Sequence, residues 1–243
     1  MITTKDWLKA SWDASRDMLT PFAGPSPGDD APAPTPLMVP IRALGPSYRE
    51  RITQHLLQLE PADRYLRFGY SATDEQIRRY TEQLDFGRDE IFGIYNRRLE
   101  LIAMAHLAFA EHPEHKQCAE FGVSVLKKAR GRGFGARLFD RAIMHARNEG
   151  VNMVFIHALT ENTAMLKIAR KAGATVQRDG SESEAYLQIP PASFDTRMAE
   201  IVEQQFAEMD YRLKRQAKQF WDFLASVQEV RQGVRHARHQ SAE

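Results

Sequence analysis

The sequence predicts an α/β domain in which helices flank a mixed, mostly antiparallel sheet, followed by one long C-terminal helix. Two observations lead to this architecture. Between residues 38 and 190, short apolar runs typical of strands alternate with amphipathic segments typical of helices. From residue 193 onward, apolar residues recur at intervals of three and four among charged ones, which is a helical period. We therefore assign residues 38–190 to the domain and residues 193–243 to the helix.

Composition narrows the function classes. The chain has 243 residues and a formal net charge of +1, so no bulk attraction to nucleic acid or to a membrane surface is expected. The single cysteine, Cys118, cannot form an internal disulfide and suits a reducing compartment. No stretch reaches the ~18 apolar residues of a membrane-spanning helix. The sequence thus predicts a soluble, cytoplasmic protein.

Two segments are expected before the domain. Residues 1–20 can form an amphipathic helix that carries Trp7 and Trp12 on its apolar side. Residues 21–37 are rich in proline and glycine, a composition that forms neither a helix nor an inner strand. We interpret this second segment as a linker.

The first half of the domain is expected to form one strand, two helices and a hairpin: Met38–Ala43, Tyr48–Leu59, Asp74–Leu84, then Glu90–Tyr95 with Leu99–Ala110. Pro61 follows the first helix as a stop signal, and Thr73 or Ser71 can cap the second. The hairpin turns at Asn96 and Arg97.

The second half continues with a strand, a basic loop, a helix, a strand, a helix and two closing strands: Ala119–Leu126, then Ala136–Asn148, Val151–Leu159, Thr163–Lys171, Ala174–Gln177 and Ala185–Ile189. The loop carries Gly131, Gly133 and Gly135. A strand, a glycine loop and a helix start in this order form an anion site, because the first helical N–H groups lack partners within the helix. The spacing of the glycines is not that of a dinucleotide-binding fingerprint, and no Gly-Lys-Ser/Thr follows them.

The run RGRGFG, from Arg130 to Gly135, resembles the pyrophosphate-binding motif of the GNAT superfamily of N-acetyltransferases, Gln/Arg-x-x-Gly-x-Gly/Ala. A strand before the motif, a helix after it and a second strand leading to Asn162 complete the family pattern. Residues 64–95 and AEFGVSVL are in addition similar to Pat-type protein lysine acetyltransferases. The GNAT likeness covers about residues 38–190. It implies transfer of an acetyl group from acetyl-CoA to a primary amine, either a protein lysine or a small-molecule amine.

The resemblance also implies a binding site for acetyl-CoA. In the family, backbone groups of the strand before the loop pair with the pantetheine arm, and the corresponding residues here are Val123, Ser124, Val125 and Leu126. The loop and helix start would hold the pyrophosphate, with charge from two arginines, through Arg130, Gly131, Arg132, Gly133, Phe134, Gly135 and Ala136. Asn162 matches the family asparagine that bonds the same arm. The other interpretation of Asn162 is a helix cap, and both can hold.

Glu120 is the predicted general base. It lies on the strand at the position that matches the catalytic glutamate of related enzymes, and its neighbours Ala119 and Phe121 could partly desolvate it. The other interpretation is a solvent-facing strand residue. The tyrosine with which the family protonates the leaving thiolate is missing, because Ala169 occupies that position.

Other polar groups receive simpler interpretations. His112, His115 and Cys118 offer too few ligands for zinc, so we expect no metal. His106 and His157 are expected on strands beside the cleft. The arginines at 64–67 are interpreted first as an exposed helix face and second as a substrate or phosphate patch.

Two further hypotheses remain open. Because Ala169 removes the usual acid, the chain can be a CoA-binding sensor or interaction module without turnover. The apolar stripe of residues 193–234 cannot be buried within its own helix. It must pack on the domain, on the N-terminal helix or on a second copy, and we favour a homodimer.

Overall fold

The computed structural model describes residues 39–110, 117–180 and 182–240, with no side chains described beyond residue 219. The predicted helix at residues 1–20, the predicted linker at 21–37, and His112 and His115 lie outside the described residues. From Val39 onward the chain forms one compact unit.

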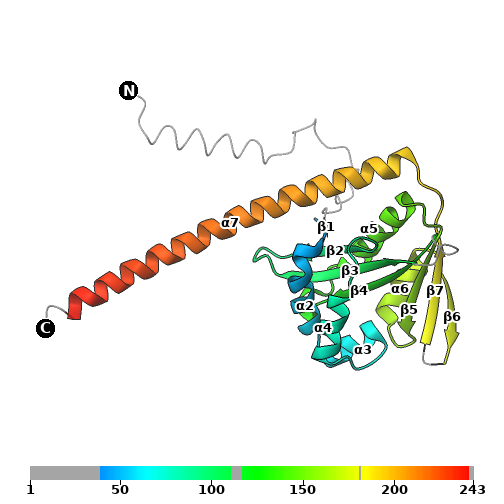
Figure 1. The fold of residues 1–243 in the computed structure, drawn as a ribbon, viewed down its shortest axis with the longest axis horizontal. Helices are drawn as coiled ribbons and strands as arrows, with labels where there is room; N and C mark the ends of the chain where they lie inside the picture. The colour runs from blue at the N-terminus through cyan, green and yellow to red at the C-terminus, as the bar shows by residue number, and fades with distance from the viewer. Residues whose placement is uncertain (1–38, 111–116, 181, 241–243) are drawn as a thin grey trace, which may run out of the picture. The chain divides into compact units, whose positions relative to one another are not determined.

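A seven-stranded sheet with the order β1-β2-β3-β4-β5-β7-β6 forms the centre of this unit (Figure 1). Its strands are β1 (Arg42–Ala43), β2 (Glu90–Tyr95), β3 (Leu101–Phe109), β4 (Cys118–Val125), β5 (Met153–Leu159), β6 (Thr175–Asp179) and β7 (Glu182–Gln188). Every neighbouring pair is antiparallel except β4 and β5, which are parallel. The predicted mixed, mostly antiparallel sheet is confirmed.

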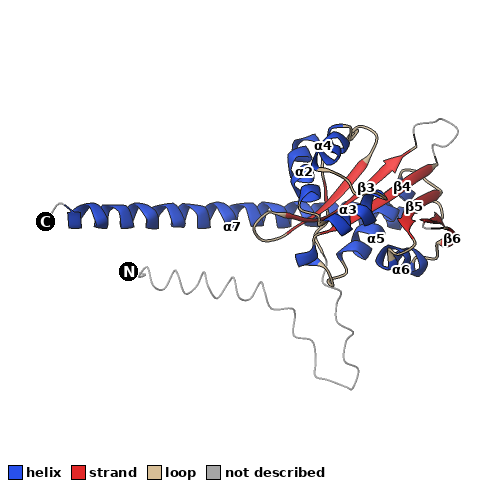
Figure 2. Cartoon of the chain, turned by 90° about the horizontal axis from the view of Figure 1, so that it is seen from below, coloured by secondary structure: helices blue, strands red, loops and turns tan. Residues whose placement is uncertain are grey.

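Helices cover both faces of the sheet. Figure 2 shows two of them, α2 and α4, on one face and another two, α5 and α6, on the other. The helices are α2 (Arg49–Leu57), α3 (Pro61–Phe68), α4 (Asp74–Glu82), α5 (Phe134–Asn148), α6 (Thr163–Lys171) and α7 (Phe194–Gln240), with short 3-10 turns at Pro46–Tyr48 and Lys127–Ala129. The long C-terminal helix predicted from the apolar period is therefore present.

Local sequence signals explain where the helices begin. Thr73 caps α4 in a capping box, because its hydroxyl accepts from the Gln76 N–H while the Gln76 side chain accepts from the Thr73 N–H. The carboxamide of Asn162 caps α6 by accepting from the N–H of Met165. Pro61 has a different effect from the one expected: it occupies the first turn of α3, where its missing N–H costs nothing, so a helix begins there that the sequence interpretation left unassigned.

The first strand is much shorter than expected. Only Arg42 and Ala43 pair with β2, opposite Gly93 and Phe92, whereas Met38–Ala43 is the predicted span. Ile41 and Leu44 are nevertheless buried, at 7% and 2% exposure. The apolar pattern thus reports burial beside the sheet edge and not a strand of that length.

Two apolar cores lie on the two faces of the sheet. On one face, Phe121 of β4 packs edge-on against Phe139 of α5, with 5.0 Å between ring centroids. On the other face, Ile52 and Leu56 of α2 pack with Met104 of β3. The alternation of side chains along β4 therefore directs odd-numbered residues toward α5 and even-numbered residues toward α2 and α3.

The first half of α7 is bound to the domain mainly through polar groups and one aromatic side chain. Glu200 accepts from Arg141 (2.7 Å) and Asn148 (2.5 Å) of α5 and lies 2.6 Å from Nδ1 of His145. Tyr211 is 8% exposed, and its hydroxyl accepts from Arg51 at 2.7 Å. These hydrogen bonds and the buried ring hold α7 against α5 and the β1–β2 edge.

The predicted apolar stripe of α7 is not the face that contacts the domain. Its side chains are between 44% and 61% exposed at Met198, Ile201, Val202, Met209 and Leu213. Ala207 and Tyr211, between these positions, are buried instead. Within the described part of the chain, no helix carries an apolar stretch long enough to cross a membrane.

Candidate active site

The two parallel strands at the centre of the sheet separate partway along their length. Cα partners join β4 to β5 only from Cys118–Met153 to Glu120–Phe155, whereas β4 stays paired with β3 as far as Val125. Beyond Glu120 the β5-facing edge of β4 has no ladder partner. The sheet thus opens into a V whose apex is at Glu120.

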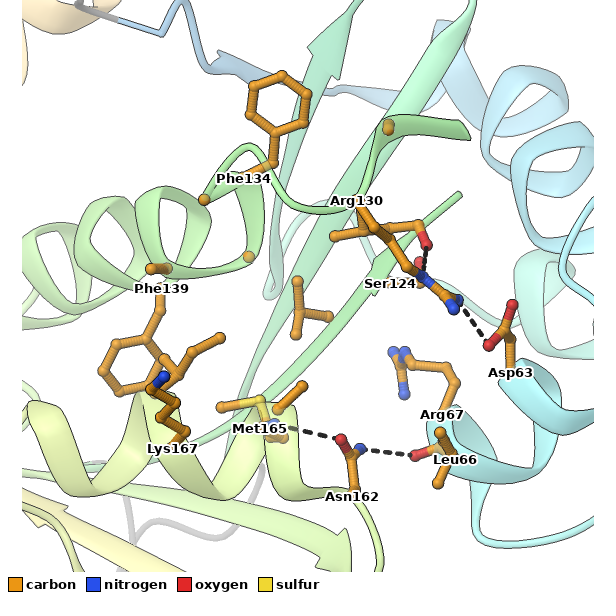
Figure 3. A pocket seen from close by; sticks show the side chains of 18 of the residues that line it. Asp63, Leu66, Arg67, Ser124, Arg130, Phe134, Phe139, Asn162, Met165 and Lys167 are labelled. Atoms are coloured by element: carbon orange, nitrogen blue, oxygen red, sulfur yellow. Dashed lines mark hydrogen bonds and ion pairs between the residues drawn. The ribbon is translucent and has the colours of Figure 1, made fainter. Parts of the chain in front are cut away.

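A cavity of about 730 Å³ lies in this opening (Figure 3). Its walls come from the open edge of β4, the loop and first turn of α5, the outer face of α6, and α3. The predicted site residues that line it are Val123, Ser124, Val125, Arg130, Gly131, Gly133, Phe134, Gly135, Ala136 and Asn162. Residues distant in the sequence are therefore brought together around one cavity.

The glycine loop presents backbone N–H groups to the cavity. Gly131 and Gly133 have φ angles of +77° and +73°, in the left-handed region that favours glycine. A Cβ atom at either position would meet nothing within 4 Å, so backbone conformation and not lack of space requires these glycines. Helix α5 begins at Phe134, directly after Gly133. The residues of this helix start line the cavity, and a helix N-terminus with unpartnered N–H groups and a positive dipole end is suited to bind an anion.

The charge on the cavity wall differs from the expected arrangement. Arg130 is already paired, because its guanidinium lies 2.5 Å from the Asp63 carboxylate and donates to the carbonyl of Val125 at 3.2 Å. Two lysines of α6 that the sequence interpretation did not select, Lys167 and Lys171, line the same cavity with exposed side chains. Positive charge on the cavity wall therefore comes from α6 as well as from the loop.

Two of the predicted cofactor-binding residues lie outside the cavity. Leu126 is 4% exposed and packs into the core beneath α2, since β4 has ended at Val125. Arg132 is exposed and does not line the cavity, because the backbone turns at the glycines on either side of it. Neither side chain contributes to the cavity wall.

Asn162 holds two helices together. Its carboxamide oxygen accepts from the N–H of Met165 at 3.2 Å, and its nitrogen donates to the carbonyl of Leu66 in α3 at 3.3 Å (Figure 3). The helix-cap interpretation is therefore what the geometry shows. The same residue also forms part of the cavity wall.

A second cavity of about 270 Å³ adjoins the first one near the apex of the V. Glu120, Glu184 and His157 line it, with His157 Nδ1 3.6 Å from the Glu184 carboxylate. Glu120 is exposed, so Ala119 and Phe121 do not desolvate it as expected. The two cavities share five wall residues: Leu66, Arg67, Val123, Asn162 and Met165.

A buried histidine supports the wall of the larger cavity. His55 is 1% exposed, and its Nδ1 lies 2.8 Å from the carbonyl of Leu101, which can only accept. Its Nε2, 2.8 Å from the Ser124 hydroxyl, is then the acceptor. Burial lowers the pKa of His55 to about 4, with a smaller contribution from the nearby Arg67 charge. His55 is therefore neutral near pH 7 and fixes the Ser124 side chain.

A second buried chain of polar groups ends at the shared wall. Arg67 donates to the Tyr80 hydroxyl at 3.1 Å, which lies 2.7 Å from His106 Nδ1. His106 Nε2 lies 3.0 Å from the Asp89 carboxylate. The pKa of Asp89 is lowered to about 2: burial opposes ionisation, but the hydrogen bonds from His106 and Arg88 outweigh it. The chain therefore ends at a carboxylate that is ionised near neutral pH.

Known proteins share this fold. Residues 54–174 match the model of the acetyltransferase (GNAT) family. The chain contains a GNAT acetyltransferase domain. Among solved structures, the GNAT domain of S. lividans PAT is similar, with a TM-score of 0.53 and 20% identity over 61% of this chain and 89% of that chain. A putative acetyltransferase from Salmonella typhimurium, solved with acetyl-CoA, has a TM-score of 0.50 and 15% identity over 64% of this chain and 96% of that chain. An acetyltransferase of the GNAT family from Streptococcus pneumoniae has a TM-score of 0.51 and 14% identity over 62% of this chain and 98% of that chain.

Within the GNAT domain, α6 supplies no tyrosine hydroxyl to the cleft. Ala169, which occupies the position of the family tyrosine, is fully buried and has no polar side chain. Among the described residues, no group of histidine, cysteine and carboxylate side chains is arranged to hold a metal ion. Negative charge that develops at this site during a reaction must therefore be stabilised by other residues or by backbone amides.

The site residues that the sequence interpretation did not select share one property: their roles depend on long-range contacts. Arg67 belongs to a run interpreted first as an exposed helix face, yet it lines both cavities. His55 and Tyr80 follow ordinary helical periods, and only the packing of α2 and α4 on the sheet reveals their polar partners. The second interpretation of these arginines was a patch that binds substrate or phosphate, and the position of Arg67 agrees with that interpretation.

Proposed function

We propose that this domain transfers an acetyl group from acetyl-CoA to a primary amine. One observation carries the proposal: two cavities adjoin near the apex of the open V and share five lining residues. The larger cavity is lined by a helix N-terminus, and the smaller one is lined by carboxylates. A long anionic thioester and a cationic amine can therefore meet at one point. Domain membership in the GNAT family supports the same reaction class.

The larger cavity fits the chemistry of a coenzyme A thioester. The N–H groups at the start of α5 would receive the pyrophosphate, with Lys167 and Lys171 adding positive charge. The open edge of β4 at Val123 and Val125 would pair with the amide groups of the pantetheine arm, as an added strand pairs with a sheet edge. The thioester then lies near the apex of the V, beside the smaller cavity.

The smaller cavity fits an amine acceptor. Glu120 and Glu184 give it negative charge, which attracts an ammonium group such as that of a lysine side chain. Glu120 lies at the apex itself, where the last β4–β5 pair joins Glu120 to Phe155. Its carboxylate is the group best placed to accept the proton of the incoming amine, directly or through one water. The likeness to Pat-type enzymes favours a protein lysine over a free amine.

The proposed step balances as follows. After the ammonium group loses one proton to Glu120, the neutral nitrogen attacks the thioester carbon and the π pair moves onto the carbonyl oxygen. That pair returns as the C–S bond breaks, so the sulfur leaves with the bonding electrons. The nitrogen then releases its second proton to solvent, and the thiolate takes up a proton from solvent. The products are an amide and free coenzyme A.

Calorimetry with acetyl-CoA, followed by detection of free thiol with a panel of lysine peptides and small amines, tests the proposal. Wild-type protein should bind acetyl-CoA and release coenzyme A with at least one acceptor class. Glu120→Gln should keep acetyl-CoA binding and lose about 10²-fold or more in kcat. Glu184→Gln, which removes the other carboxylate, should alter mainly KM for the amine, and Glu149→Gln at the exposed end of α5 should change neither. A larger loss in kcat for Glu184→Gln than for Glu120→Gln would refute the assigned base.

A CoA-binding sensor without turnover is the second candidate, and Ala169 favours it because the position of the family tyrosine on α6 carries no hydroxyl. The same panel separates the two functions. Tight binding of acetyl-CoA with no thiol release for any amine supports the sensor, and release with any one amine excludes it.

We also propose that α7 joins two copies of the chain. The support is its apolar stripe, which includes Ile201, Met209 and Leu213 and is more than half exposed in the described chain. Sedimentation should show a dimer that Leu213→Glu converts to a monomer, whereas Arg212→Glu, one residue away and exposed, should remain dimeric. A monomeric wild type would refute the dimer. The cytoplasmic location remains a prediction from the single cysteine.

A further inference from the structure

The wall between the two cavities limits which side chains can act on the reacting atoms. An acetyl group that passes from a thioester in the larger cavity to an amine in the smaller one must cross this wall. Of the five shared residues, Leu66, Val123 and Met165 are apolar, and Asn162 is already engaged at both its oxygen and its nitrogen. Arg67 is the only charged residue of the five.

The guanidinium of Arg67 has capacity left for a ligand. Among the described residues, the guanidinium donates one hydrogen bond, to the Tyr80 hydroxyl at 3.1 Å, and no carboxylate forms an ion pair with it. A guanidinium carries five N–H groups, so most of them remain available. Figure 3 shows the group extending from α3 into the cavity between Ser124 and Asn162.

The position of the guanidinium is fixed by its neighbours. Gly122 of β4 leaves room for it, since a Cβ atom there would lie 2.7 Å from the Arg67 Cζ. Tyr80, His106 and Asp89 then form a directed chain in which each group donates to the next, from Arg67 to the Asp89 carboxylate. Burial raises the pKa of Tyr80 above its ordinary value, so its hydroxyl keeps the proton that it donates to His106. Such a chain holds a cation in place before any ligand binds.

We infer that Arg67 is a catalytic residue of this domain, and that its guanidinium donates a hydrogen bond to the thioester carbonyl oxygen of the acyl donor. This inference rests on the proposed acetyl transfer. When the amine nitrogen attacks the carbonyl carbon, the π pair moves onto that oxygen, and the fixed charge of Arg67 stabilises it. When the pair returns and the C–S bond breaks, the same charge lies close to the departing thiolate. Arg67 neither gains nor loses a proton, so it meets the electrostatic need that Ala169 leaves open.

Isotope-edited infrared difference spectroscopy tests the contact without any amine acceptor. Wild-type protein with acetyl-CoA labelled with ¹³C at the carbonyl should show the thioester C=O band at lower frequency than the same compound in buffer. Arg67→Gln should return the band to its solution position, while the Kd for acetyl-CoA changes by less than about threefold. Arg78→Gln, an exposed arginine on α4 that lines neither cavity, should keep the wild-type shift. An unshifted band in the wild-type complex, or a shifted band in Arg67→Gln, would overturn the inference.

Kinetics with an amine found in the panel provide the second measurement. Loss of one donor to a developing oxyanion lowers kcat by about 10²–10³-fold, so Arg67→Ala should lose kcat with little change in KM for acetyl-CoA. Added guanidinium ion at millimolar concentration should restore part of the rate, which it cannot do if Arg67 serves only in folding. Tyr80→Phe, which removes the positioning hydroxyl, should give a smaller loss in kcat. If acetyl-CoA fails to bind the wild type, the proposed function fails; if it binds and turns over equally in Arg67→Ala, only the role of Arg67 fails.

Discussion

His55 should make the stability of this domain depend on pH between about 6.5 and 4. The perturbation is His55→Gln, which keeps a neutral polar side chain under β4 but removes the ionisable ring. In the folded protein the ring is buried, donates to the carbonyl of Leu101 and accepts from Ser124, so protonation would place a charge in the core and break the second contact. An unfolded chain has no such penalty, and there the ring can protonate freely.

The sign and size of the effect follow from linkage. The pKa of His55 is about 4 in the folded state and 6.5 for an exposed histidine, so the unfolded state binds more protons as pH falls. The contribution of neutral His55 to the free energy of unfolding is nearly complete above pH 6.5 and is lost as pH falls toward 4. With these two pKa values, protonation of His55 lowers the free energy of unfolding by about 1.4 kcal/mol at pH 5.5 and by about 2.6 kcal/mol at pH 4.5, relative to its value at high pH. The carboxylates of Asp89 and Glu200, with pKa values of about 2, lose their contributions mainly below this range.

Urea unfolding at pH 7.5, 6.5, 5.5 and 4.5, followed by far-UV circular dichroism, measures this dependence. The free energy of unfolding of the wild type should fall along the stated curve. His55→Gln should start lower at pH 7.5, because it forms poorer hydrogen bonds, and then lose about 1.4 kcal/mol less than the wild type between pH 7.5 and 5.5. His157→Gln, which removes an exposed histidine, should follow the wild type. Equal losses for the wild type and His55→Gln over that interval would refute the buried neutral histidine.

Three further substitutions test the backbone and the attachment of α7 through urea unfolding. Gly133→Ala places a side chain at φ +73°, so it should cost about 1–2 kcal/mol and weaken acetyl-CoA binding in calorimetry, whereas Gly45→Ala, at ordinary φ and in open space, should do neither. Tyr211→Ala empties a buried aromatic site and should cost about 3 kcal/mol, while Arg212→Ala, at an exposed position outside the proposed dimer face, should stay within about 0.5 kcal/mol; equal costs would contradict the observed face of α7. Glu200→Gln removes the closer of the two carboxylates that pair with the buried cation of Arg141, leaving only Glu203 at 3.7 Å, and should cost about 3 kcal/mol; an unchanged midpoint would show that the pair with Glu200 is not formed in solution.

Elements with strong local signals could be predicted from the sequence. Helix α6 runs from Thr163 to Lys171 as expected, because a capping asparagine precedes it and Gly173, at φ +87°, follows it. The glycine loop and the start of α5 were predictable for the same reason. Errors occurred where one residue type has two meanings. Pro61 can end one helix or begin the next, and here it begins α3.

The candidate site was only partly predictable, because strand and loop residues carry local signals and their partners do not. The sequence indicates that Arg130 is a cation beside the glycines, but nothing in it reveals that Asp63 of α3 neutralises that charge. Similarly, a glutamate between two apolar residues suggests burial, yet Glu120 is exposed because it lies where β4 and β5 separate. Arg67 reaches the wall of both cavities only through the packing of α3 on the sheet.

The separation of β4 from β5 has a consequence for the resistance of the protein to proteolysis. The end of β4 beyond Glu120 has no β5 partner, so the pantetheine arm of a bound acyl donor would pair with this open edge and stabilise the sheet. A ligand at 100 times its Kd adds about 2.7 kcal/mol to the free energy of unfolding. With acetyl-CoA bound as proposed, the domain would therefore unfold less often and resist proteolysis better than the free domain.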